Sequence, residues 1–526
     1  MQRFYAVFAL NTEKGIVINM NILKNPVKIV VTDNYSHEYN AIESDVKINY
    51  DGNHLKITAE RTKIKNIKLY FNRPRRRNSM VYVDTWERAY GDLAWRSGNA
   101  KGAWYMIEYA RNSAFCVGVK IQPNSFCSWE YDGDTIIFTA DIKNGADGVL
   151  LGGRTLLAAE LIEAELFGAA DECATQFCGM MCDTPKRLGA YVYGGNDWYC
   201  NYGNNSYEKI IRHAQRIAEC APAGDNRPYM VVDDGWELCH CDDGVPEHFY
   251  NGGPWAYNNR NFDDMQKLAS DLKRIGVIPG IWYRPLMTLE KLPDEYILRR
   301  DGLVNILDIS QKCVLDLVKE DISRFADWGY GLIKHDFSSW DLFGKWGFEM
   351  QDEVVPNNCK FHDKSRTNAE IIKSFYKTIK EAANDTLIMG CNTFSHLSAG
   401  IFDLQRTGDD TSGREWDRTR KMGINTLAMR MHQHNIFYGV DADCVGITNA
   451  VPWEKNKQWL DVLSKSGTPL FVSIADDAYS VEVKNAIKTA FELAAQNQVT
   501  SRAVIEKDKL TPDTWESVTG TDIYKW

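Results

Sequence analysis

Residues 229–236 read YMVVDDGW, an apolar run that ends in two adjacent aspartates. Similar runs end in aspartates within residues 331–337, 402–410 and 436–443. Amphipathic stretches with the periodicity of a helix lie between these runs. Apolar runs that alternate with such stretches predict βα units. We predict eight strands, at residues 189–194, 229–234, 277–284, 331–337, 386–392, 402–410, 436–443 and 469–474. Eight such units in about 300 residues favour a (β/α)8 barrel. An open doubly wound sheet is the alternative, although no glycine-rich phosphate motif follows the first strand.

The sequences on either side of the predicted barrel have patterns that are typical of β-strands. Short β-branched and aromatic runs, separated by turn signals such as Asp51-Gly52-Asn53, predict an antiparallel sandwich at residues 1–183. We expect a short helix near residues 156–167 at its end. The barrel then spans residues 184–495, and residues 496–526 begin a small C-terminal β-segment.

Composition excludes several classes of protein. The 526 residues are 44% hydrophobic and 25% charged, which is typical of globular proteins and excludes disordered or fibrous chains. The net charge of -10 argues against a nucleic-acid partner. The one dense basic run, Arg73, Arg75, Arg76 and Arg77, is predicted to be a solvated loop. No apolar run reaches the roughly 18 residues that suggest a membrane span, so no membrane partner is expected.

The cysteines and the N-terminal stretch bear on the compartment. Thirteen scattered cysteines favour reduced thiols, as in the cytoplasm. Two cysteine clusters, one at residues 173–182 and one at residues 239–241, lack the paired spacing of a zinc site, so we predict neither a metal nor a cofactor. Residues 1–11 lack a signal-peptide cleavage pattern, and a periplasmic location would require a leader that has been removed.

The aspartates at the strand ends point to chemistry. Active sites of barrels lie at the C-terminal ends of the strands. A single aspartate there could be a helix N-cap, but four strands that end in this way favour a functional site. Two facing carboxylates are typical of glycoside hydrolysis. Lys334 shares a strand face with Asp336 and would keep it ionised, whereas His335 points to the opposite face and is predicted to pack.

Three motifs together resemble a known family. Residues 231–236, 334–336 and 406–410, on the second, fourth and sixth strands, resemble the signatures of the α-galactosidase clan, glycoside hydrolase families 27 and 36. The sandwich ahead of the barrel is more like family 36. The resemblance in sequence covers residues 186–495. The N-terminal region resembles the family only in its predicted architecture, a β-sandwich ahead of the barrel.

The resemblance implies a role for each matching residue. Asp336 would be the nucleophile and Asp410 the acid/base, with the neighbouring Asp409 as the alternative for the second role. Asp233 and Asp234 would grip the galactose 4- and 6-hydroxyls. The further substrate-binding positions that it implies are Trp198, Trp236, Trp282, Arg284, Lys334, Cys391, Asn392, Arg406 and Asp443. Of these, Cys391 and Asn392 lie where the family reads the substituent at the 2-position.

Three features depart from the family pattern. His335 stands where family 36 members often have tryptophan, and Arg284 stands where many have an acidic residue. Residues 391–396 replace a glycine-rich segment. An arginine in place of a carboxylate would suit an anionic or differently linked sugar.

The resemblance thus implies a retaining, exo-acting α-galactosidase, with no cofactor, that acts on an oligosaccharide or glycoconjugate with terminal α-galactose. We expect Asp410 to have the higher pKa of the two catalytic carboxyls, and the carboxyls to lie about 5–5.5 Å apart. The alternatives are an α-N-acetylgalactosaminidase or a galactosyl transferase of the same clan, or an inactive sugar-binding relative. A homo-oligomer is compatible with the sequence.

Overall fold

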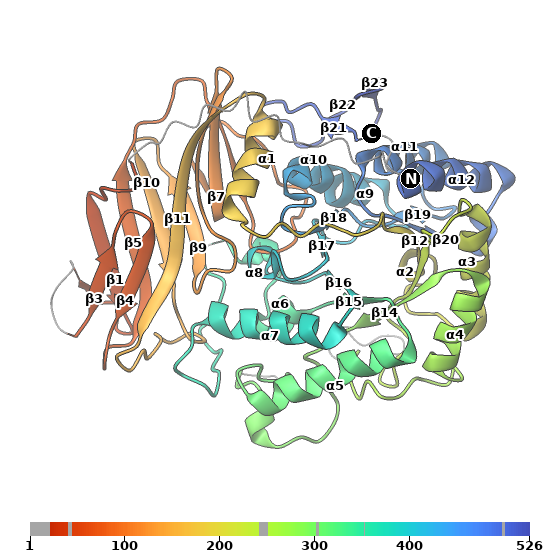
Figure 1. Ribbon diagram of the computed structural model, residues 1–526, viewed down its shortest axis with the longest axis horizontal. Helices are drawn as coiled ribbons and strands as arrows, with labels where there is room; N and C mark the ends of the chain where they lie inside the picture. Colours follow the sequence, from red (N-terminus) through yellow and green to blue (C-terminus); the bar gives the residue numbers. More distant parts are fainter. Residues whose placement is uncertain (1–21, 40–44, 241–250, 301–304, 352, 497–499) are drawn as a thin grey trace, which may run out of the picture.

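The computed structural model describes residues 22–39, 45–240, 251–300, 305–351, 353–496 and 500–526. The N-terminal stretch at residues 1–11 and Cys241 lie outside these described residues. A sandwich and a barrel stand beside each other in Figure 1, and α1 (Ala170–Met181) connects them. No helix in the described residues is both long and apolar enough to cross a membrane.

The sandwich consists of eleven described strands in one antiparallel path that wraps on itself (Figure 1). Their order is β2-β1-β5-β10-β9-β7-β8-β11-β4-β3, with β6 paired to β7. The strands are β1 (Lys28–Asp33), β2 (Glu38–Tyr39), β3 (Lys47–Tyr50), β4 (His54–Thr58), β5 (Ile64–Asn72), β6 (Met80–Asp84), β7 (Ala100–Ala110), β8 (Ser113–Val119), β9 (Phe126–Tyr131), β10 (Thr135–Asp141) and β11 (Thr155–Phe167). The sandwich predicted from the turn signals is therefore present.

The helix expected near residues 156–167 is wrong, because this segment is β11. Its sequence is rich in alanine, leucine and glutamate, which favour helices. Its first half, residues 155–160, pairs with β4, and its second half, residues 161–167, pairs with β8. Sheet pairing along the whole segment outweighs the small intrinsic helix preference of these residues.

The basic run at residues 73–77 is a loop that is only partly solvated, with Arg77 exposed. Arg73 is buried, and its Nη1 lies 2.5 Å from Glu108 Oε2. Arg76 reaches the same carboxylate at 3.3 Å and also Glu165 at 2.9 Å. The acidic partners lie on β7 and β11, far away in sequence, so the local pattern did not reveal that Arg73 and Arg76 are paired.

The barrel is built from parallel strands whose pairing follows the order β18-β17-β16-β15-β14-β13-β12-β20-β19. The strands are β12 (Tyr193–Asn196), β13 (Tyr229–Val232), β14 (Ile278–Tyr283), β15 (Leu332–His335), β16 (Leu387–Gly390), β17 (Leu404–Arg406), β18 (Gly439–Asp441), β19 (Val445–Ile447) and β20 (Leu470–Ile474). Apolar side chains from most of them, such as Val231, Leu332 and Leu404, fill the interior.

The ends of this path, β18 and β19, are two halves of one strand. Residues 442–444 separate them, and Asp443 has a φ of +73° there. Aspartate tolerates this left-handed conformation better than most residues do. The split strand closes the ring, so the sheet is the predicted eight-stranded barrel.

Helices cover the barrel where the periodicity predicted them. They are α3 (Tyr207–Cys220), α4 (Met265–Ile275), α5 (Lys312–Trp328), α7 (Asn368–Ala383), α11 (Trp453–Ser466) and α12 (Val481–Gln496). Between β17 and β18 the chain instead forms the short α9 (Trp416–Thr419), a π-helical turn and α10 (Thr426–Arg430). The C-terminal β-segment is a sheet of β21 (Arg502–Ala503), β22 (Thr514–Ser517) and β23 (Gly520–Ile523).

The sandwich docks on the barrel through residues 84–90, which follow β6. Ala89 N donates to Thr407 O at 2.8 Å, and Asp409 N donates to Ala89 O at 3.0 Å. Arg430 on α10 binds Asp84 through Nη2 at 2.7 Å, and both side chains are buried. These contacts bring sandwich residues to the end of β17, where two predicted site residues lie.

Candidate active site

Asp336 lies directly after β15, at the C-terminal rim of the barrel. Its side chain is buried, and Trp282 Nε1, at the end of β14, donates to Asp336 Oδ2 at 3.1 Å. The backbone N–H of Phe337 donates to Oδ1 at 2.8 Å. Two neutral donors thus fix the carboxylate in one orientation without a direct ion pair to it among the described residues.

Lys334 is the nearest cation on the same strand. Its Nζ lies 2.7 Å from Asp233 Oδ2, and Asn196 Nδ2 donates to that same oxygen at 2.5 Å. Burial alone would lower the pKa of Lys334, but Asp233 and Asp336 hold it well above its usual value. The ammonium is therefore a permanent charge beside Asp336.

His335 points away from this group, as the alternation of the strand predicts. It is fully buried against Phe375 and Tyr376 of α7 and against Phe402. Neither ring nitrogen has a hydrogen-bond partner in the described residues. Burial lowers the pKa of His335 to about 3, so it is neutral and serves packing.

Asp234 belongs to a separate polar group after β13. Asn251 Nδ2 donates to its Oδ2 at 2.6 Å, and His240 Nδ1 lies 3.4 Å from its Oδ1. The same Nδ1 lies 3.2 Å from Glu237 Oε1. Burial opposes a proton on His240, but hydrogen bonds to both carboxylates raise its pKa to about 10.

Asp234, Glu237 and His240 offer ligand atoms within 4.8 Å of one another, which is a spacing that could hold a metal ion. The imidazolium balances one of the two carboxylates, and burial together with the charge of Glu237 raises the pKa of Asp234 to about 7. The cysteine cluster at residues 173–182 offers no comparable ligand set, and the twelve described cysteines are all free thiols.

The end of β17 supplies Arg406, which is fully buried among three aspartates. Its Nη2 lies 2.8 Å from Asp443 Oδ2 and 3.2 Å from Asp410 Oδ1. Its Nε lies 3.9 Å from Asp441 Oδ2. Asp443 also accepts from Thr411 N at 2.8 Å. Asp443 therefore holds Arg406 in place from the bend of the split strand.

Asp409 and Asp410 have different surroundings, although they are adjacent. Asp409 is clamped between Arg88 Nη2 at 2.9 Å and Arg418. The side chain of Asp410 is 33% exposed and meets Arg406, with Arg88 Nη1 further away at 3.5 Å. This arrangement leaves Asp410 the freer of the two to meet a ligand.

Both candidate catalytic carboxyls are held ionised in the free site. Burial raises the pKa of Asp336, but Lys334 and Arg88 outweigh it and bring the pKa below the usual value. Burial likewise opposes the charge on Asp410, but Arg406, Arg88, Lys334 and Arg418 lower its pKa to about 2. The pKa of Asp410 is therefore lowered in the free protein instead of raised, because four cations act on it.

Arg284 carries a charge that is already paired. It is 1% exposed, and it contacts Asp341 through Nη2 at 2.6 Å and through Nε at 3.0 Å. Its guanidinium also lies over the ring of Phe337. Asp341 on α6 (Ser338–Phe343) was not anticipated from the sequence, and its charge removes the reason to expect an anionic sugar.

Of the other predicted tryptophans, Trp236 packs against α5, and Trp198 lies at the end of β12. Trp236 is fully buried against Trp255 and against Phe325 of α5, so it packs behind the barrel wall. Trp198, in α2 (Trp198–Asn201), is half-buried at the end of β12.

Cys391 and Asn392 follow β16 at the same rim. Cys391 Sγ lies 3.5 Å from Arg88 Nη1 and 3.7 Å from Arg406 Nη1. Asn392 donates weakly to Glu87 at 3.4 Å. Glu87 and Arg88 are thus sandwich residues inside the site. A sequence reading confined to barrel motifs had no signal for them.

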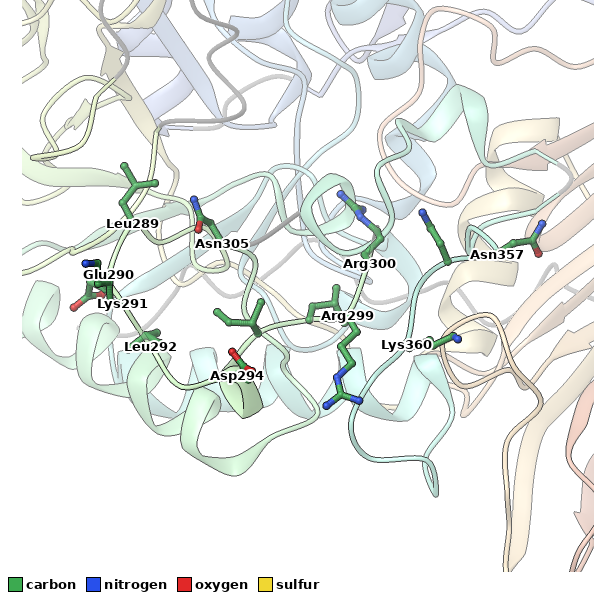
Figure 2. A pocket seen from close by; sticks show the side chains of 13 residues that line it. Leu289, Glu290, Lys291, Leu292, Asp294, Arg299, Arg300, Asn305, Asn357 and Lys360 are labelled. Atoms are coloured by element: carbon green, nitrogen blue, oxygen red, sulfur yellow. The ribbon is translucent and has the colours of Figure 1, made fainter. Parts of the chain in front are cut away.

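A separate cavity of about 760 Å³ lies beside the loop after β14 (Figure 2). Its lining includes Arg299, Arg300 and Lys360, and it contains none of the predicted site residues. Its lining is polar and lies on exposed loops.

Comparison with solved structures identifies proteins with a similar fold. No family model matches this sequence. The chain is similar to the α-galactosidase TtGalA from Thermus thermophilus in complex with p-nitrophenyl α-D-galactopyranoside, with 14% identity, a TM-score of 0.60 and coverage of 94% of this chain and 98% of that one. It is also similar to the GH36 α-galactosidase AgaA from Geobacillus stearothermophilus, with 13% identity, a TM-score of 0.59 and coverage of 89% and 70%. A cycloalternan-degrading enzyme from Trueperella pyogenes is similar at 11% identity and a TM-score of 0.53, with coverage of 86% and 70%.

The protein therefore has the fold of the family 36 α-galactosidases, as the motifs suggested: a sandwich, a barrel and a small C-terminal sheet. At these identities the likeness establishes the fold. The same fold also occurs in an enzyme named for a different substrate, so the choice of sugar depends on the site itself.

Proposed function

We propose that the protein is a retaining, exo-acting α-galactosidase with Asp336 as nucleophile and Asp410 as acid/base. The observation that carries the proposal is the pair of carboxylates at one barrel rim. Asp336 is oriented by Trp282, and Asp410 lies close enough for its charge to act on the pKa of Asp336. The α-galactosidase structures that share the fold support the choice of reaction.

In the first step, an Asp336 oxygen attacks the anomeric carbon of the sugar. The bond from that carbon to the glycosidic oxygen breaks, and the proton of Asp410 passes to the leaving oxygen. In the second step, water attacks the same carbon, gives its proton to Asp410 and releases Asp336. The sugar leaves with the configuration that it had in the substrate.

Asp410 must bind a proton before the first step, because the surrounding cations keep it ionised in the free site. Its side chain is 33% exposed, so a bound sugar would remove its remaining solvent. Desolvation favours the neutral carboxyl and raises its pKa. We propose that substrate binding supplies this change.

The surroundings of Cys391 favour galactose over N-acetylgalactosamine. By resemblance, this position faces the 2-substituent of the sugar. Both Arg88 and Arg406 lie within 3.7 Å of the Cys391 sulfur, so the space around it is filled by side chains. An N-acetyl group would need to displace one of these buried arginines.

The test is hydrolysis of p-nitrophenyl α-galactoside by the wild type, with Asp336→Gly and Asp410→Gly assayed in azide. Azide can occupy the space of a removed carboxylate and attack the anomeric carbon. With Asp336→Gly we expect the β-galactosyl azide, and with Asp410→Gly the α-galactosyl azide, identified by NMR.

The matched control is Asp409→Gly, which removes the neighbouring carboxylate. If Asp409→Gly forms α-galactosyl azide and Asp410→Gly does not, then Asp409 is the acid/base instead of Asp410. Hydrolysis of the N-acetylgalactosaminide but not of the galactoside by the wild type would refute the proposed substrate.

A further inference from the structure

Residues 84–90 of the sandwich form part of the wall of the candidate site. Glu87, which is fully buried, accepts from Gly347 N at 2.6 Å and interacts with Ser339 on α6. Together with the backbone bonds of Ala89 to the β17 end, these contacts fix the segment on both flanks of Arg88. The position of Arg88 is therefore set by the docking of the sandwich.

Arg88 is 4% exposed, and its charge is balanced by barrel residues. Its two terminal nitrogens divide between the adjacent carboxylates, with Nη2 on Asp409 at 2.9 Å and Nη1 near Asp410 at 3.5 Å. A buried guanidinium is retained when it is paired in good geometry, and its removal leaves carboxylates without compensation. The flat guanidinium fixes the orientation of both carboxylates relative to each other.

We propose that Arg88 is a positioning residue through which the sandwich sets the protonation of Asp410. This inference rests on the proposed function for its catalytic meaning. Arg88 clamps Asp409 in a structural role and leaves Asp410 as the carboxyl that exchanges a proton. A barrel without this arginine would hold Asp410 less strongly ionised.

Several charged or titratable groups face Asp410 besides Arg88. Arg406 comes from β17, Lys334 and Asp336 from the end of β15, and Arg418 from α9. Asp409 is its neighbour, the charge of Asp410 acts on Tyr199 of α2, and Asp443 shares Arg406 with Asp410. Arg88 differs from all of these because it belongs to the sandwich.

The experiment measures how readily Asp410 carries a proton, without a substrate. A water-soluble carbodiimide modifies protonated carboxyls, and peptide mass spectrometry gives the rate at Asp410, with the exposed Asp476 as internal standard. The variants are Arg88→Gln, Arg88→Lys and the control Arg418→Gln, which removes a cation that contacts Asp409 directly and makes the smallest of the four cationic contributions at Asp410.

At pH 5 we expect Arg88→Gln to label Asp410 about tenfold faster than wild type, which corresponds to a pKa rise of roughly one unit. Arg88→Lys, which keeps the charge, and Arg418→Gln should each change the rate about twofold or less. An unchanged rate in Arg88→Gln, or an equal increase in Arg418→Gln, would overturn the proposal. If Arg88→Gln does not fold, Arg88→Lys decides the role of the charge. Labelling of Asp410 at the wild-type rate in this variant supports the role, and labelling that is tenfold faster refutes it.

Hydrolysis separates this inference from the proposed function. With a galactoside whose leaving group must be protonated, such as raffinose, the basic limb of the kcat/KM profile should move to higher pH in Arg88→Gln, because Asp410 stays protonated to a higher pH. A uniform loss of activity at every pH would indicate a merely structural arginine. If the wild type hydrolyses no α-galactoside, the proposed function fails, and the labelling rates still decide the role of Arg88.

Discussion

Replacing Lys334 by methionine tests the charge balance at the base of the site. Lys334 and Asp233 are buried and lie 2.7 Å apart, so the change leaves Asp233 with Asn196 and a backbone N–H as its remaining donors. Removal of one partner from a buried ion pair costs about 3–5 kcal/mol. We therefore expect Lys334→Met to lose roughly that much stability at pH 8.

The pH dependence gives the sign of the effect. In the wild type, burial already raises the pKa of Asp233 and Lys334 opposes this rise, so without Lys334 the pKa rises further above its value in the unfolded chain. Between those two pKa values the folded variant binds more protons than the unfolded chain, so its stability falls as pH increases. The deficit relative to wild type should thus be largest at pH 8 and shrink towards pH 4.5.

Urea unfolding followed by tryptophan fluorescence measures this deficit. The double variant Lys334→Met/Asp233→Asn, which carries neither charge, should be no less stable than either single variant. A deficit that is the same at both pH values, or single-variant losses that simply add in the double variant, would refute the reasoning.

Three further outcomes follow from other contacts. His335→Phe should raise the free energy of unfolding by about 1–3 kcal/mol, because both ring nitrogens of His335 are buried without partners in the described residues. His396→Phe loses a hydrogen bond to Val119 O and should not raise it, and thermal melts compare the two variants. Trp282→Phe removes a donor to Asp336 and so raises the pKa of that carboxyl, which should move the acidic limb of kcat/KM to higher pH and lower kcat about tenfold. Dialysis against EDTA should leave the melting temperature unchanged, because the His240 imidazolium already contacts both Asp234 and Glu237, and a fall that zinc or calcium restores would identify a bound metal.

Local periodicity was sufficient to predict the barrel, because each strand and helix carries its own apolar pattern. Lys334 and Asp336 were placed on one face, and His335 on the other, by strand alternation alone. The same local reasoning failed at β11, where pairing with two distant strands decides the structure. Propensity is a weak guide wherever partners lie far away in sequence.

The charges of the site were harder to anticipate than its residues. Arg284 looked like a free cation until Asp341, 57 residues later, proved to be its partner. Asp410 looked like a ready acid until Arg88, 322 residues earlier, was found beside it. Electrostatic surroundings depend on contacts between segments that no motif contains, so the lowered pKa of Asp410 was not predictable from the strand-end motifs.

The split seventh strand gives the barrel a seam. β18 pairs with β17, β19 pairs with β20, and in the described residues neither half pairs on its other side. Ring continuity there depends on the covalent chain at residues 442–444 instead of on a continuous ladder of hydrogen bonds. Amide protons of β18 and β19 should therefore exchange with deuterium before those of β14 and β15, each of which is paired on both sides. Because Asp443 holds Arg406 from within this seam, the first local opening of the barrel would also release the arginine that faces Asp410.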